Sequence, residues 1–163
     1  YPANWLQLAS TSEREALGIT EVSEEVRPDD RFYWVTDNND GTYTSTAKNL
    51  NDVEEVDPEG NQLYVQVWDS ETESMVDSEE RLVTKGLKSQ WISTIKDTAN
   101  SLLSPTDWYV IRKYESDTAI PTNIATFRTA VKTECNRLET AITSAVDVEE
   151  LIEVVSSQNW PNK

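Results

Sequence analysis

The chain has 163 residues, 30 of them acidic and 14 basic, so its net charge at pH 7 is -16. This length accommodates one domain, or a small domain joined to a helical unit, with a buried core. The negative charge repels phosphate groups, so we expect neither nucleic acid nor an anionic membrane as a partner. The acidic residues either keep the protein in solution or form a face that matches a basic partner.

Residue types that support common catalytic and metal chemistry are scarce. The sequence contains no His, and Cys135 is its only cysteine. An intrachain disulfide, a Cys/His zinc site and His-based catalysis are therefore excluded. We expect no cofactor, no metal and no enzymatic activity. Acidic pairs such as Glu54-Glu55 are interpreted as solvated faces, and a polysaccharide-degrading enzyme, which needs two carboxylates in a cleft, is the least favoured alternative.

The first 26 residues contain one clear local signal. Ser10 or Thr11 is placed to cap a short helix over residues 12–17, and Gly18 is placed to end it. The residues on either side are predicted to be extended, with Trp5 as an apolar anchor in the first segment.

Residues 31–46 carry the strongest hairpin signal in the chain. Aromatic and β-branched residues precede and follow the turn Asp37-Asn38-Asn39-Asp40-Gly41, whose residue types tolerate positive φ. Trp34 and Tyr43 are placed to pair across the strands. The Asp and Asn oxygens of the turn also suggest a calcium loop, but the bidentate Glu of such loops is missing, so a simple turn is favoured. We expect this hairpin to meet a partner, unless it is buried in the core.

A second hairpin is predicted from the alternating residues 63–69, followed by a turn and a return strand at residues 74–76. Together the two hairpins predict a small antiparallel sheet near residues 31–76.

The remainder of the chain has helical periodicity. Ser78 is predicted to cap a first long helix, which Ser104-Pro105 stops, and a short helix over residues 106–114 follows with Trp108 plugging the join. Apolar residues then predict a second long helix from Thr122, packed antiparallel on the first, and Asp147 caps a last helix over residues 148–155.

The predicted fold class is therefore α+β: a small antiparallel β-hairpin region, then an antiparallel α-helical hairpin with a short extra C-terminal helix. The predicted domains are a small mixed N-terminal domain, residues 1–77, and a helical hairpin domain, residues 78–163.

Four short motifs carry a resemblance to a known family. They are Leu102-Leu103, Thr106-Asp107-Trp108, Phe127-Arg128-Thr129-Ala130-Val131 and Trp160-Pro161. Together they resemble the tail assembly chaperone family of tailed bacteriophages over about residues 82–161, with Phe127 in place of a Tyr and Val131 in place of a Leu. The segments 15–19, 27–35 and 40–43 resemble sequences found ahead of this helical unit in phage tail proteins.

The resemblance implies a protein that acts on phage tail or tail-fibre subunits. It would either chaperone their folding and trimerisation or stay attached in the particle, so its place is the virion tail or the host cytoplasm during assembly. Self-association of the chain is left open.

Each candidate protein-binding residue has a structural alternative. The candidates are Trp34, Tyr43, Trp108, Arg128 and Trp160. Trp108 either anchors a partner or packs in the core. Arg128 either pairs with Asp107 across the helical hairpin or contacts a partner. Trp160 either docks onto another chain or belongs to a tail that folds back.

Overall fold

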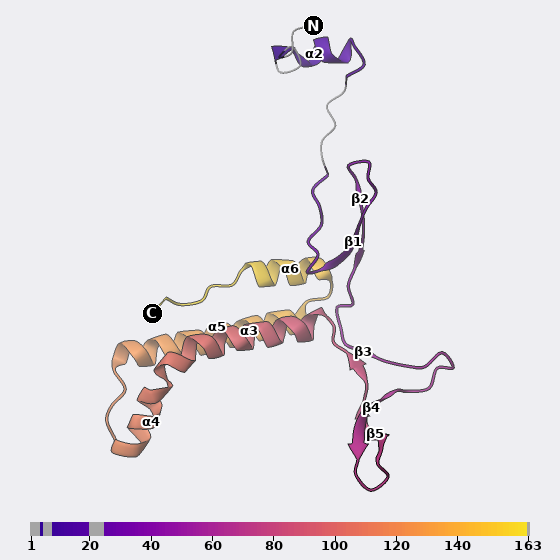
Figure 1. The fold of residues 1–163 in the computed structure, drawn as a ribbon. Coiled ribbons are helices and arrows are strands. Elements are labelled where there is room, and N and C mark those ends of the chain that lie inside the picture. The colour runs from indigo at the N-terminus through magenta and orange to yellow at the C-terminus, as the bar shows by residue number, and fades with distance from the viewer. Residues whose placement is uncertain (1–3, 5–7, 20–24, 163) are drawn as a thin grey trace. The chain divides into compact units, whose positions relative to one another are not determined.

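The computed structural model describes residues 4, 8–19 and 25–162 (Figure 1). The chain divides into two compact units, which we call unit 1, Tyr1–Thr46, and unit 2, Ala47–Lys163. The predicted α+β fold is confirmed, because antiparallel β-hairpins precede a group of packed helices. The division into domains at residues 77 and 78 stays a prediction. Trp5 and most of the predicted extended segment at residues 19–26 lie outside the described residues.

Unit 1 contains the short helix α2, Thr11–Glu15. Its capping box is complete: the Glu13 amide donates to Ser10 Oγ at 3.4 Å, and the Ser10 amide donates to the Glu13 carboxylate at 2.9 Å. These reciprocal bonds satisfy two amide groups that a helix start leaves without partners. The helix begins one residue before and ends two residues before the predicted bounds, and Gly18, with a φ of 74°, lies in the turn that follows it.

The first predicted hairpin is also confirmed, as β1, Tyr33–Asp37, pairs with β2, Tyr43–Ala47. Its turn needs residues that accept positive φ, and it has Asn39 at 59° and Gly41 at 85°. The Asp37 carboxylate accepts a hydrogen bond from the Asn39 amide at 2.8 Å, which holds the turn closed.

Unit 2 begins with two further strand pairs. The antiparallel strands β3, Val53–Glu54, and β6, Val83–Thr84, form one pair, and β4, Tyr64–Asp69, with β5, Ser74–Arg81, forms the other. The second predicted hairpin is therefore confirmed and is longer than expected. The single small sheet expected near residues 31–76 is wrong, because the described strands form three separate two-stranded sheets. A register shift in the β4–β5 ladder interrupts regular pairing near its base, as bulges do.

The predicted start of the first long helix is wrong. Ser78 lies in β5, and the helix α3 spans Leu87–Leu103. Ser78 with its two following acids has the composition of a helix start, but pairing of β5 with β4 overrides this local preference. Residues 74–77 and Arg81 pair with β4, and Ser78, Glu79 and Glu80 lie at the register shift between them, so the segment stays extended.

A loop distant in sequence holds the true start of α3. The amides of Leu87 and Lys88 donate to the carbonyls of Asn49 and Leu50 at 2.9 and 3.0 Å. The Gly86 amide donates to the Asp52 carboxylate at 2.8 Å. These contacts bring the loop so close that a Cβ on Gly86 would lie 2.3 Å from the backbone of Asn51, so only glycine fits there.

The rest of unit 2 is helical. The elements are η1, Ser104–Thr106; α4, Asp107–Ser116; α5, Thr122–Ser144; and α6, Val148–Ser156. The helices α3 and α5 lie side by side (Figure 1). They are antiparallel, because Lys88 near the start of α3 donates to the Thr143 carbonyl at 3.0 Å near the end of α5. The predicted cap of the last helix is confirmed, since the Asp147 carboxylate accepts a hydrogen bond from Glu150 at 2.8 Å.

The core of unit 2 lies between these helices. Its members are apolar residues at helical spacing, so the predicted stripes of the two long helices face each other. The buried apolar residues within the helices α3, α5 and α6 are Leu87, Ile95, Ala99, Ile124, Phe127, Val131, Leu138, Ile142, Val148, Leu151 and Val155.

Candidate protein-binding surface

The turn between α3 and α4 is tightly built. Pro105 has no amide hydrogen and cannot continue an α-helix, so α3 gives way to the short 3-10 helix η1 at this point. Thr106 is completely buried, and its hydroxyl donates to the Leu103 carbonyl at 2.7 Å. That bond satisfies a carbonyl that the end of α3 leaves free.

Arg128 reaches from α5 and fastens this turn. Its Nη1 atom donates to the Leu103 carbonyl at 3.0 Å, to Thr106 Oγ1 at 2.6 Å and to Asp107 Oδ1 at 2.8 Å. The predicted pair of Arg128 with Asp107 is therefore confirmed. A guanidinium suits this position because it carries several donors in a fixed plane. Arg128 acts here as a positioning residue for the start of α4.

An apolar cluster lies beside the turn. Ala99, Phe127 and Val131 form its buried centre, and partly buried residues surround them: Leu102, Leu103, Cys135 and Trp160. Burial raises the pKa of the Cys135 thiol, which keeps it protonated. Five residues of the four motifs at residues 102–161 lie in this cluster, namely Leu102, Leu103, Phe127, Val131 and Trp160. Thr106, Asp107 and Arg128 of the same motifs meet in the Arg128 contacts.

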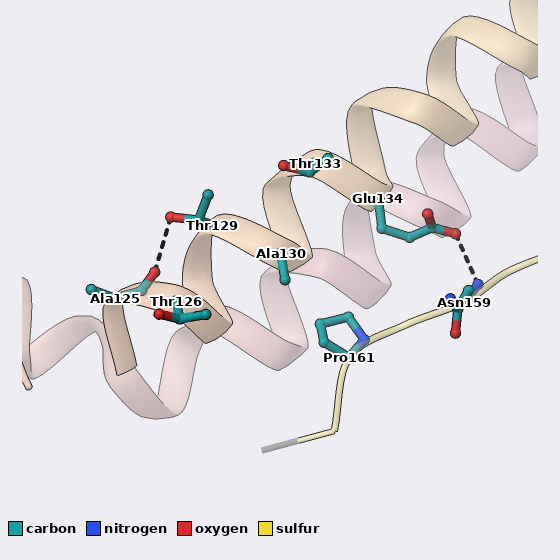
Figure 2. A pocket seen from close by; sticks show the side chains of 8 residues that line it. All are labelled: Ala125, Thr126, Thr129, Ala130, Thr133, Glu134, Asn159 and Pro161. Atoms are coloured by element: carbon teal, nitrogen blue, oxygen red, sulfur yellow. Dashed lines mark hydrogen bonds between the residues drawn. The ribbon is translucent and has the colours of Figure 1, made fainter. Parts of the chain in front are cut away.

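The C-terminal tail folds back along α5, which decides between the two alternatives for Trp160. The Asn159 amide donates to Glu134 Oε1 at 2.8 Å, as Figure 2 shows, and Trp160 Nε1 donates to Gln158 Oε1 at 2.8 Å. The side chain of Arg137 bonds to the Glu134 carboxylate and, with the Asn159 amide, holds the pKa of Glu134 below its usual value. Trp160 is therefore a packing residue of this chain.

An open groove of about 630 Å³ lies between the tail and α5 (Figure 2). Its walls are mainly the small side chains of α5 together with Pro161, among them Ala125, Thr129 and Ala130. Glu134 is the one ionisable group among the described residues that line it, and that carboxylate is already occupied by Arg137 and Asn159. The groove therefore has no pair of carboxylates for glycoside hydrolysis.

Trp108 is not buried at the join, so the prediction that it plugs the join is wrong. The buried Thr106 and the Arg128 side chain occupy that place, while Trp108 is 49% exposed. Its ring lies 3.9 Å from the ring of Tyr109, and the guanidinium carbon of Arg112 lies 4.7 Å from the Trp108 centroid. Stacking on both neighbours orients Trp108 while leaving a face open to solvent.

The whole of α4 lacks a buried residue, and its apolar side chains form an exposed stripe. We define the α4 stripe as the four exposed apolar residues Trp108, Val110, Ile111 and Tyr114. Trp108, Ile111 and Tyr114 follow one another at intervals of three, and Tyr114 lies four residues after Val110, so the four side chains spread over about half of the helix circumference. Tyr114 is 93% exposed. Exposed contiguous apolar residues of this kind, with Trp, Tyr and Arg among them, are typical of protein interfaces.

Sequence reasoning identified Trp108 and missed the other three residues of the stripe. The available signal was the spacing of Trp108, Ile111 and Tyr114 at intervals of three, which marks one helix face. This spacing does not show whether the face is covered, because that depends on the neighbours of an amphipathic helix and not on its own sequence.

The two candidate residues in unit 1 lie on the β1–β2 hairpin. Trp34 on β1 is exposed. Tyr43 on β2 is half-buried, with the Arg27 guanidinium 5.7 Å from its ring centroid and its own amide donating to Glu25 at 3.1 Å. Within unit 2, Arg128 fixes the start of the helix that carries Trp108, and Trp160 lies in the adjoining apolar cluster.

The turn of the β1–β2 hairpin uses its carboxylates to hold the backbone. Asp40 Oδ1 accepts hydrogen bonds from the Thr42 amide at 3.0 Å and from the Thr42 hydroxyl at 2.6 Å. These bonds keep the pKa of Asp40 below its usual value. Among the described residues, no group of three or more Asp, Glu or Cys side chains is arranged to hold a metal ion.

No family model, curated protein or solved structure matches this chain. Within the described ranges, no helix combines the length and the apolar character needed to cross a membrane.

Proposed function

We propose that this protein is a tail- or tail-fibre-associated protein of a bacteriophage that binds tail or fibre subunits. It acts either as an assembly chaperone or as a structural attachment component of the virion tail. Its working location is accordingly the virion tail, or the host cytoplasm during assembly. The motifs that resemble the tail assembly chaperone family supply the phage-tail part of the proposal.

One observation carries the binding part: α4 exposes four large apolar side chains from a turn that is otherwise firmly held. Arg128 and Thr106 fix the start of α4, so the stripe needs little reordering to meet a partner. A side chain that is already oriented loses less conformational entropy on binding, which favours affinity. Covering one side chain of this size contributes about 1.5–3 kcal/mol.

The net charge of -16 supports the choice of a protein partner over nucleic acid or an anionic membrane. It also disfavours close packing of several copies of this chain, because like charges repel. Tail and fibre subunits that present a basic or apolar surface are the partners that this charge allows.

The experiment that tests the proposal is quantitative mass spectrometry on purified, salt-washed particles of the phage that encodes the chain. A fixed ratio to a known tail protein would establish a virion component. Absence from particles, together with co-purification of tail or fibre subunits from infected lysate, would establish a chaperone. Absence from both particles and subunit complexes would refute the proposal.

A further inference from the structure

The hairpin β4–β5, which we call the β4–β5 arm and define as residues 64–81, extends from a small junction of strands (Figure 1). At the junction, the Glu55 amide donates to the Leu82 carbonyl at 2.9 Å, and the Leu82 amide donates to the Leu63 carbonyl at 2.8 Å. Arg81 adds an ion pair with Glu54 at 2.7 Å. Beyond this base, the arm is a two-stranded ribbon, and among the described residues its strands pair only with each other.

Both faces of the arm carry apolar side chains. Trp68 pairs directly with Met75, and Val67 pairs directly with Val76. Directly paired residues share a face and neighbours alternate, so these two pairs lie on opposite faces. Trp68 is 64% exposed and Met75 is 54% exposed, so the face that they form is open to solvent.

Such an arm is poorly suited to stand alone in water. A sheet that faces solvent on one side normally alternates apolar and polar residues, whereas strands that are apolar on both faces are usually covered on both. An isolated two-stranded hairpin is only marginally stable, and each of its strands has an unpaired edge. These features point to a partner that covers the arm.

The charges of the arm select the kind of partner. Six of its residues are acidic, Asp69, Glu71, Glu73, Asp77, Glu79 and Glu80, and its single basic residue, Arg81, is paired with Glu54. Asp69 and Asp77 are engaged within the arm by Thr72 and Gln66. The other four carboxylates form no ion pair with any described residue. Glu71 and Glu73 lie in the turn of the arm, and Glu79 and Glu80 lie at the register shift near its base. The apolar centre is therefore flanked at both ends by a negative rim, which disfavours edge pairing with a second copy of the arm.

We propose that the β4–β5 arm inserts into an apolar pocket of a phage tail or fibre subunit whose rim carries Lys and Arg residues. The identity of the partner as a tail or fibre subunit rests on the proposed function above. The apolar pairs supply the buried centre of the interface, and the four unpaired carboxylates meet the basic rim. This surface is separate from the α4 stripe, so the protein has two places at which it engages other chains.

The test compares two phage variants with the same change of charge. Met75→Lys removes the apolar centre of the arm and places a positive charge there. The matched control Val146→Lys also replaces an exposed apolar residue by Lys, but in the loop between α5 and α6. We expect Met75→Lys to lower the amount of this chain bound to particles or to co-purified subunits by about tenfold or more, and Val146→Lys to stay within about twofold of the unchanged chain.

A second variant, whose side chains keep their shape, shows whether a loss of binding can be separated from misfolding of the arm. Glu71→Gln combined with Glu79→Gln leaves the shape of the arm unchanged and removes two rim charges. We expect it to bind less tightly and with a weaker dependence on salt than the unchanged chain. In the unchanged complex, a zero-length carbodiimide reagent should join Glu71 or Glu79 to a Lys of the bound subunit, detected by mass spectrometry of the cross-linked peptides.

The outcomes separate this proposal from the proposed function. If the chain is present in particles or subunit complexes and Met75→Lys binds as well as the control, the arm proposal is wrong and the proposed function stands. If the unchanged chain is found in neither, both are wrong. If Met75→Lys instead converts a dimer of this chain to a monomer in sedimentation measurements, the arm binds a second copy and the assignment of a basic subunit is overturned.

Discussion

Replacing Arg128 by Ala should lower the free energy of unfolding of the helical unit by about 2–3 kcal/mol, because it removes the contacts that hold the turn between α3 and α4. The Nη1 atom of Arg128 makes three contacts, to the Leu103 carbonyl, to Thr106 Oγ1 and to Asp107 Oδ1. The Arg128 side chain is 14% exposed and that of Asp107 is 55% exposed, so water screens the ion pair, which contributes about 0.5 kcal/mol. The two bonds at the buried side contribute about 1 kcal/mol each, and the lost packing of the Arg stem supplies the rest.

The assay is urea unfolding of the full chain, followed by far-ultraviolet circular dichroism. Asp107→Asn tests how the contribution of Arg128 divides between the ion pair and the other contacts. It keeps the shape of the side chain and removes the screened charge pair, so it should lower the free energy of unfolding by only about 0.5 kcal/mol or less. Arg112→Ala is the matched control, because it removes the same kind of side chain, here from α4, without breaking an ion pair in the described part of the chain. It should lower the free energy of unfolding by less than about 1 kcal/mol. Equal costs for Arg128→Ala and Arg112→Ala, or a cost for Asp107→Asn as large as that for Arg128→Ala, would refute the reasoning.

Three further predictions use the same unfolding assay. Asp147→Ala should lower the free energy of unfolding by about 1 kcal/mol, because the Glu150 amide loses its cap, while Asp147→Ser should be nearly neutral; equal losses would contradict the capping account. Gly86→Ala should cost more than about 2 kcal/mol, because the added Cβ would lie 2.3 Å from the Asn51 backbone, and a neutral result would mean that the loop moves freely. Folding lowers the pKa of the Glu134 carboxyl, so the stability that its carboxylate contributes is present above the unfolded pKa and is lost as pH falls through the folded pKa. The Glu134→Gln variant should therefore lose less stability than the unchanged chain between about pH 7 and about pH 3. Parallel curves of stability against pH would contradict this.

Local chemistry explains the elements that could be predicted from the sequence. The capping box at Ser10, the cap at Asp147 and the stop at Pro105 each depend on residues within about four positions of one another. The turn of the first hairpin likewise requires only that Asn39 and Gly41 accept positive φ. Side-chain caps and backbone preferences act over one turn of the chain, so the residues that decide these elements are neighbours in the sequence.

The start of α3 shows where such reasoning fails. Ser78 and the acids after it satisfy the local rules for a helix start, yet these residues belong to β5, which pairs with β4 on both sides of the register shift. The true start at Leu87 depends on the loop at residues 49–52, more than thirty positions earlier. Helix and strand preferences of single residues differ by only about 1 kcal/mol, so pairing with a distant segment overrides them.

The candidate site likewise has some features that follow from the local sequence and others that follow from contacts between distant segments. The sequence by itself determined that Asp107 and Arg128 have complementary charge, that Trp108 belongs to a short helix beginning at Thr106 or Asp107, and that the chain has neither His nor a cysteine pair. Only the tertiary structure decided that Arg128 fills the join, that the tail carrying Trp160 folds back, and that Trp108 and Met75 remain exposed. The physical reason is that an apolar residue is attracted to any available apolar surface, and which surface covers it depends on how segments distant in sequence pack.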